Sequence, residues 1–245
     1  MLALAIVQLS CARVLPWSRE PIGAEVNLAF TLEKNLIRLS TVRIDNRPGH
    51  FILGSAAPRT IVDSRFRLHR FGTHALQMNQ RETVRIDPAP ANLGGVTDAI
   101  VGVDAWRNRA VSIDYRTGLV TWQKEGIKSG LMHIYRFPAE PMINVFVDGR
   151  EVAAVVDTTS PDTLVLPGPD ARGSVNVLIA DTDFGAIDVQ YAEVSQARVG
   201  NRLLSRFLVT IDYGRKVVGL WRDPRTPLRE PPPPATITPP APAGS

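Results

Sequence analysis

Short runs of apolar and β-branched residues recur along the chain, and the clearest pair surrounds a two-residue turn signal. The runs Met142–Val147 and 151–156 flank Asp148-Gly149. An Asp-Gly dipeptide between two such runs is the strongest short-range hairpin signal, because both residues tolerate positive φ. This pattern predicts two antiparallel strands joined by a tight turn.

Other segments also have the pattern of strands. An earlier part of the chain predicts a strand over 39–44, a turn over 46–49 and a strand over Phe51–Leu53. Further strands are expected at 111–115, 175–179 and 209–213, with turns at Thr117-Gly118 and at Gly214. Helix is expected only as one or two turns within 63–71 and 201–206. The fold class predicted from the pattern is therefore all-β.

The chain contains an internal repeat. Residues 51–62 align with 154–165, with Pro, Thr and Val at equivalent places. Later, Ile100-Val-Gly and the segment 111–115 reappear as Arg198-Val-Gly and 209–213. Both matches occur in the same order and at nearly the same separation, so the chain is interpreted as two copies of one β-rich unit.

The repeated motifs resemble those of the pepsin/retropepsin aspartic proteases. In that family each lobe carries an apolar-apolar-Asp-Thr/Ser-Gly motif and, later, an apolar-apolar-Gly motif that braces it. The matching positions here are Gly54, Ser55, Ala56 and Gly102 in the first copy, and Asp157, Thr158, Thr159 and Gly200 in the second. The resemblance covers roughly residues 30–222. It implies two homologous β-barrel-like lobes related by a pseudo-twofold axis, which is the aspartic-protease (acid protease) fold.

The expected organisation has four parts. A lead-in over 1–24 precedes an N-terminal lobe over 25–128 and a C-terminal lobe over 129–222, and a proline-rich tail follows over 223–245. Proline removes a backbone donor, so the tail is expected to be an extended or disordered end. The apolar start followed by Ser10-Cys11-Ala12 is typical of the end of a signal peptide and favours export to the periplasm, cell surface or medium. The alternative is a short buried segment at the start of the first lobe.

One of the two expected catalytic carboxylates is missing. The chemistry of the family needs two facing carboxyl groups that share one proton. Asp157 supplies one of them, whereas Gly54 has no side chain that could donate or accept a proton. A lone Asp157 is expected to be partly exposed and anionic near pH 7. The family's motif has glycine at its third position, where the backbone passes close to the other lobe. Ala56 and Thr159 stand there in this chain, and their Cβ atoms are expected to cause steric crowding.

The middle position of each motif survives. In the family, hydroxyls at Ser55 and Thr158 would hydrogen-bond across the lobes, so the resemblance implies a working scaffold with a disabled dyad. The expected function is non-catalytic binding of a peptide or protein segment in an inter-lobe cleft, by a monomer. A purely structural or partner-binding role belongs to the same class.

An active aspartic endopeptidase is the alternative. It would need a substitute acid or a dimer that brings two copies of Asp157 together. Candidate acids near the motifs are Asp63, Asp98 and Asp162, although each is also typical of a turn or helix cap. Asp114 and Asp212 occupy equivalent strands, which indicates a structural role such as bonding an adjacent turn.

Composition argues against several other classes. Hydrophobic residues make up 44% and charged residues 21% of the 245 residues, as in ordinary folded proteins. The net charge of +4 is spread without a basic run, so no nucleic-acid partner is expected. The sequence has no apolar stretch of about 20 residues, so it predicts no transmembrane helix. No cofactor motif appears, and the histidines (His50, His69, His74 and His133) lack metal-ligand spacing. A different β-barrel function remains the last alternative.

Overall fold

The structure is a computed structural model that describes residues 24–68, 72–79, 82–107, 109–123, 127, 130 and 132–225. This part of the chain is built of β-strands, with a four-residue helix α1 (Asn201–Leu204) and two short 3₁₀ turns, η1 (Ser64–Phe66) and η2 (Val103–Ala105). The predicted all-β class is confirmed. The predicted lead-in and the proline-rich tail fall almost wholly outside the described residues.

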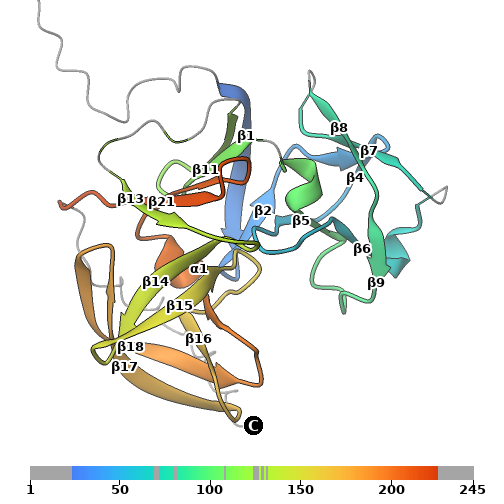
Figure 1. The fold of residues 1–245 in the computed structure, drawn as a ribbon. Helices are drawn as coiled ribbons and strands as arrows, with labels where there is room; N and C mark the ends of the chain where they lie inside the picture. The colour runs from blue at the N-terminus through green and yellow to red at the C-terminus, as the bar shows by residue number, and fades with distance from the viewer. Residues whose placement is uncertain are drawn as a thin grey trace, which may run out of the picture.

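The strands form three sheets (Figure 1). The largest has eleven strands in the order β13 (His133–Arg136), β21 (Val217–Trp221), β20 (Leu208–Asp212), β11 (Ala110–Asp114), β12 (Leu119–Gln123), β1 (Ala24–Glu33), β2 (Leu36–Leu39), β5 (Phe51–Leu53), β10 (Ala99–Val101), β6 (Ile61–Asp63) and β9 (Ala89–Ala91). A four-stranded sheet contains β4 (Arg47–Pro48), β3 (Arg43–Ile44), β7 (His74–Gln77) and β8 (Thr83–Ile86). A closed barrel contains β14 (Met142–Val147), β15 (Arg150–Val156), β19 (Ala197–Val199), β16 (Leu164–Pro167), β18 (Thr182–Ala192) and β17 (Ala171–Ile179).

The eleven-stranded sheet takes strands from both copies of the repeat. β11 of the first copy pairs antiparallel with β20 of the second, and Ser112 lies opposite Thr210 at the centre of that pairing. The hydroxyls of these two residues are 2.8 Å apart. Figure 1 shows the barrel at the lower left and β6 to β9 at the right, with β1, β11, β13 and β21 at the upper left. The two halves are therefore joined by a continuous backbone ladder.

The aligned segments have the same pairing in both halves. In the first, β10 pairs parallel with β5 and antiparallel with β6, and β6 pairs parallel with β9. In the second, β19 pairs parallel with β15 and antiparallel with β16, and β16 pairs parallel with β18. This arrangement places the segments that follow β5 and β15, which carry the two motifs, at equivalent positions.

Alternating burial orients the strands. In β14, Ile143 and Val145 are fully buried, whereas Asn144 and Phe146 face outward, as expected for a strand with one buried face. The buried residues of both halves form one continuous apolar cluster. The elements around the motifs therefore stand on a shared core rather than on separate ones.

The predicted turns are partly correct. The hairpin of β14 and β15 turns at Asp148-Gly149, whose φ values are 48° and 78°. The expected strand over 39–44 is wrong, since it divides into β2 and β3, and the turn comes at Asp45-Asn46 instead of 46–49. The Asp45 carboxylate accepts a hydrogen bond of 2.9 Å from the backbone N–H of Ala75, which holds the chain in this earlier turn.

Candidate functional site

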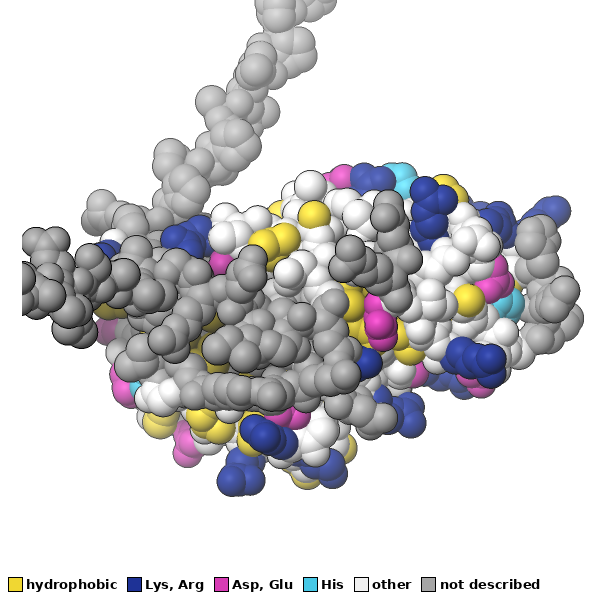
Figure 2. All heavy atoms as spheres, turned by 90° about the horizontal axis from the view of Figure 1, so that it is seen from above, with side chains coloured by type: hydrophobic (Ala, Val, Ile, Leu, Met, Phe, Trp, Pro, Cys, Tyr) yellow, Lys and Arg dark blue, Asp and Glu magenta, His cyan; other side chains and the backbone are white. Residues whose placement is uncertain are grey.

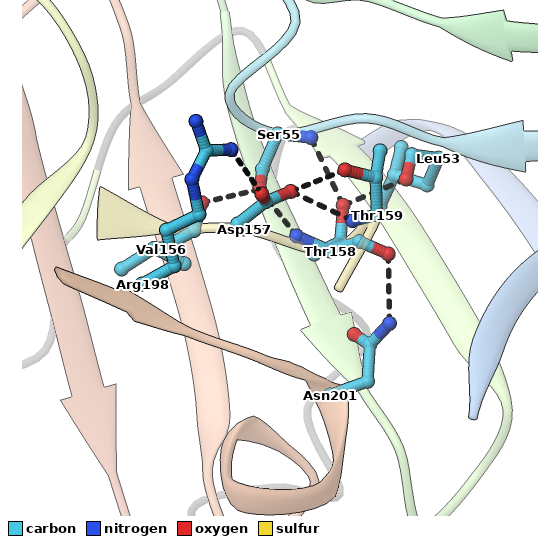
Figure 3. A network of polar contacts seen from close by, with 8 residues as sticks. All are labelled: Leu53, Ser55, Val156, Asp157, Thr158, Thr159, Arg198 and Asn201. Atoms are coloured by element: carbon cyan, nitrogen blue, oxygen red, sulfur yellow. Dashed lines mark hydrogen bonds and ion pairs between the residues drawn. The ribbon is translucent and has the colours of Figure 1, made fainter. Parts of the chain in front are cut away.

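The two motif segments meet through a reciprocal set of hydrogen bonds (Figure 3). The backbone N–H of Ser55 donates to Thr158 Oγ1 at 2.9 Å, and the backbone N–H of Thr158 donates to Ser55 Oγ at 3.0 Å. Each hydroxyl then donates across to the other half, Ser55 to the Val156 carbonyl at 2.6 Å and Thr158 to the Leu53 carbonyl at 2.7 Å. Because all of these groups are buried and bonded, the segments are held rigidly against each other.

The two brace glycines allow close backbone approach. A Cβ on Gly102 would lie 2.3 Å from the Arg59 carbonyl, and one on Gly200 would lie 2.4 Å from the Asp162 carbonyl. No other residue fits such positions without moving the backbone. Next to these glycines, Val101 and Val199 accept hydrogen bonds from Gly54 and Asp157. Each brace strand therefore fixes the motif beside it.

Asp157 is buried, and both of its carboxylate oxygens accept hydrogen bonds. Its Oδ1 accepts from the backbone N–H of Thr159 at 2.9 Å and from Thr159 Oγ1 at 2.6 Å. Its Oδ2 lies 2.6 Å from Nη1 of Arg198 in an ion pair. The side chain of Asp157 is 3% exposed, so the expectation of partial exposure is wrong. Within the described residues its carboxylate bonds only to Thr159 and Arg198, and short charge-assisted bonds of this kind are strong.

The position opposite Asp157 is closed. A Cβ added to Gly54 would lie 2.5 Å from Cγ2 of Ile100 and 3.4 Å from Cγ2 of Thr159. Ile100 and Arg198 are equivalent, since each is the middle residue of its brace strand. One half therefore combines glycine with an isoleucine that fills the space, and the other combines aspartate with an arginine that neutralises it. A carboxylate does not fit at Gly54 in this arrangement.

Two half-buried tyrosines at the ends of strands in the eleven-stranded sheet support the motifs. The Tyr213 hydroxyl donates to the Ser55 carbonyl at 2.7 Å. The Tyr115 hydroxyl donates to Asn201 Oδ1 at 2.8 Å, and Asn201 Nδ2 donates to the Thr158 carbonyl at 2.7 Å. Burial raises the pKa of both phenols well above the ordinary value, and the side chain of Trp106 partly offsets this for Tyr213. Both tyrosines are therefore neutral donors at physiological pH.

The remaining motif residues and acids have separate places. Ala56 and Thr159 are half-buried, and the hydroxyl of Thr159 donates a hydrogen bond to Asp157. Asp98 accepts from the backbone N–H of His50 at 2.7 Å, and Asp63 caps η1. Hydrogen bonds from Arg65 hold the pKa of Asp63 far below its usual range.

The paired strand-end aspartates bond to turns, as expected. Asp114 accepts from the backbone N–H groups of Arg116 and Thr117, and Asp212 accepts from that of Arg215. None of the described acids, Asp162 included, has a hydrogen bond to Asp157.

Sequence reasoning missed Arg198 as a site residue, together with Ile100, Tyr115 and Tyr213. A signal for Arg198 was present, because the repeat places a charge at a strand position where the other copy has Ile100. That charge occurs in the same copy that keeps an aspartate. A charge at a strand position that is apolar in the other copy predicts a nearby partner of opposite sign.

Other kinds of site find little support in the part of the chain that is described. No group of three or more His, Cys, Asp or Glu side chains there is arranged to hold a metal ion. No helix among those residues is long and apolar enough to cross a membrane. On the face drawn in Figure 2, the Lys and Arg side chains that can be seen lie in several separate groups, with Asp and Glu between them.

Comparison with known proteins identifies no relative: neither a family model nor a curated protein matches the chain. Functional inference therefore depends on the chain's own residues.

Proposed function

We propose that this chain is a non-catalytic protein of the aspartic-protease fold that binds an extended peptide or protein segment. The observation that carries the proposal is the pairing of Asp157 with Arg198. Closure of the space beside Gly54 by Ile100 supports it. Together these contacts occupy the surviving acid and exclude a second one.

The chemistry of the pair argues against peptide-bond hydrolysis. An aspartic dyad needs one carboxylate to take a proton from water while the other donates a proton to the scissile carbonyl. A guanidinium stays protonated in proteins, so Arg198 cannot serve as the general acid. A positioned acid or base is worth about 10² to 10⁴ in rate, and this site offers neither in the required form.

The same contacts favour binding. The Arg198 side chain is 40% exposed, and within the described residues only its Nη1 is committed, to Asp157. The buried carboxylate fixes the guanidinium in one orientation, so part of the ordering cost of a ligand contact is already met. The remaining N–H donors suit a peptide carbonyl or carboxylate. Asp157 acts here as a positioning residue for Arg198.

The test is peptide retention by the full chain. A peptide library is passed over the wild type, Arg198→Met and Arg150→Gln, which changes an exposed arginine in the barrel. The wild type and Arg150→Gln are expected to retain the same peptides and release them intact. Arg198→Met should bind them about tenfold or more weakly, the value of one charge-assisted hydrogen bond. No retention by the wild type, or equal affinity in Arg198→Met, would count against the proposal.

A further inference from the structure

A second polar pocket lies in the N-terminal half, lined by none of the residues that surround Asp157. It has a volume of about 300 Å³ and lies between β8, the η2 segment and β12. It adjoins a shallower pocket of about 560 Å³, and the two share Arg85, Asp104 and Arg107. The volume of the first pocket suits a ligand about the size of a monosaccharide.

Several buried polar atoms of residues that line this pocket have no hydrogen-bond partner among the described residues, and two of them belong to Trp122 and Asp104. Trp122 is 4% exposed, and its indole Nε1 makes no hydrogen bond. Asp104 uses Oδ1 to accept from the backbone N–H and the hydroxyl of Thr60, at 2.7 and 2.8 Å, but its buried Oδ2 has no partner. Buried polar groups in folded proteins are almost always satisfied. The wall of the pocket therefore contains a donor and an acceptor that the described residues leave unsatisfied.

The indole of Trp106 lies in the same wall. Its Nε1 makes no hydrogen bond of ordinary geometry, although the side chain is close enough to Tyr213 to lower the pKa of that phenol against the effect of burial. Both indole N–H groups in this wall, those of Trp106 and Trp122, therefore lack a hydrogen-bond partner among the described residues.

Two arginines at the pocket have no acidic partner in the described structure. Arg85 and Arg107 are exposed and form no ion pair there, whereas their neighbour Arg109 pairs with Glu82 at 3.5 Å and stacks on Trp122, 4.1 Å from the ring centre. The lining arginines, Arg85, Arg107 and Arg109, outnumber the lining acids, Glu82 and Asp104, so the wall has an excess of positive charge. Guanidinium groups bind phosphate and carboxylate through paired N–H donors.

We propose that this pocket binds a hydroxylated organic anion, such as a sugar phosphate or a sugar acid. A hydroxyl can both accept a hydrogen bond and donate one, so ligand hydroxyls suit an indole donor such as Trp122 Nε1 and a carboxylate acceptor such as Asp104 Oδ2. The anionic group of the ligand binds Arg85 and Arg107. This site is independent of the peptide-binding role of Arg198.

The experiment is titration calorimetry on the full chain with four probes. Glucose 6-phosphate and glucuronate carry both hydroxyls and charge, glucose has hydroxyls alone, and inorganic phosphate has charge alone. One of the two complete probes is expected to bind at least about tenfold more tightly than either partial probe. The stronger of the two identifies the ligand's anionic group as phosphate or carboxylate.

Variants locate the binding. Arg107→Gln and Arg85→Gln change exposed side chains and should each weaken binding about tenfold, while Arg172→Gln, an exposed arginine of β17, should not. Trp122→Phe should weaken binding and melt at a temperature close to that of the wild type. If Trp122→Phe does not fold, the two arginine variants test the location of the binding site. The proposal is overturned by the absence of binding, by inorganic phosphate binding as tightly as the complete probes, or by arginine variants that bind like the wild type.

Discussion

Replacing Arg198 should destabilise the chain more than replacing its partner. Arg198→Met keeps much of the apolar stem but leaves the Asp157 carboxylate 3% exposed with no positive charge beside it. Asp157→Asn keeps an acceptor for Thr159 and leaves Arg198, which is 40% exposed, able to turn toward water. The structure therefore predicts an asymmetry between two variants of one ion pair.

The size of the effect follows from burial. Removing one partner of a fully buried pair costs about 3 to 5 kcal/mol. Arg198 is exposed by more than a third, so solvent screening reduces that value. A hydrogen bond to a charged group contributes about 1.5 to 3 kcal/mol, and we expect Arg198→Met to cost about 2 kcal/mol. Asp157→Asn should cost about 1 kcal/mol or less.

Urea denaturation at pH 7 measures both values, and the double variant completes a thermodynamic cycle. The cycle should give a coupling energy of about 1 kcal/mol or more between the two side chains. If Arg198→Met is as stable as the wild type, or if the coupling is absent, the ion pair does not hold the site and the reasoning fails.

Three other perturbations test the surrounding contacts. Thr158→Val leaves the Ser55 N–H without its acceptor and should cost about 2 kcal/mol in urea denaturation. Gly54→Asp should give no peptide cleavage and lose about 1 to 3 kcal/mol of stability, part of which Ile100→Ala restores, since the added Cβ lies 2.5 Å from Ile100. As the pH rises above about 10, the wild type should lose more folding stability than Tyr213→Phe. The pKa of the Tyr213 phenol is raised in the folded chain, so the phenol's contribution to stability is fully present below the ordinary pKa and is progressively lost above it.

Each of these has a contrary outcome. A Thr158→Val protein as stable as the wild type would show that the reciprocal hydrogen bonds do not join the halves. Cleavage by Gly54→Asp would mean that the closed space opens readily. Identical alkaline stability curves for the wild type and Tyr213→Phe would mean that the phenol ionises as easily in the folded chain as in the unfolded one.

Local chemistry made the strands and one hairpin predictable. Asp148-Gly149 needs only its own backbone preferences to form a turn, and the alternation in Met142–Val147 reports which face is buried. The earlier turn at Asp45-Asn46 was not predicted, because the hydrogen bond from Ala75 that holds it comes from 30 residues further along the chain.

The candidate site likewise has features that the sequence predicted and features that depend on contacts distant in sequence. The repeat placed Gly54 and Asp157 at equivalent positions, and the hydroxyls of Ser55 and Thr158 each accept a hydrogen bond from the backbone of the other half. The partner of Asp157 was missed because Arg198 is 41 residues away in sequence and belongs to a strand where apolar residues were expected. The burial of Asp157 depends on that pairing, so partial exposure was the natural prediction for an aspartate considered alone.

Peptide cleavage tests the central claim most directly. The full-length wild type and Asp157→Asn are incubated with a diverse peptide library from about pH 3 to 7, and the products are identified by mass spectrometry. The account predicts no cleavage by the wild type beyond that of Asp157→Asn at any pH. Cleavage by the wild type that disappears in Asp157→Asn would contradict it and would mean that Asp157 leaves Arg198 to act as an acid or base.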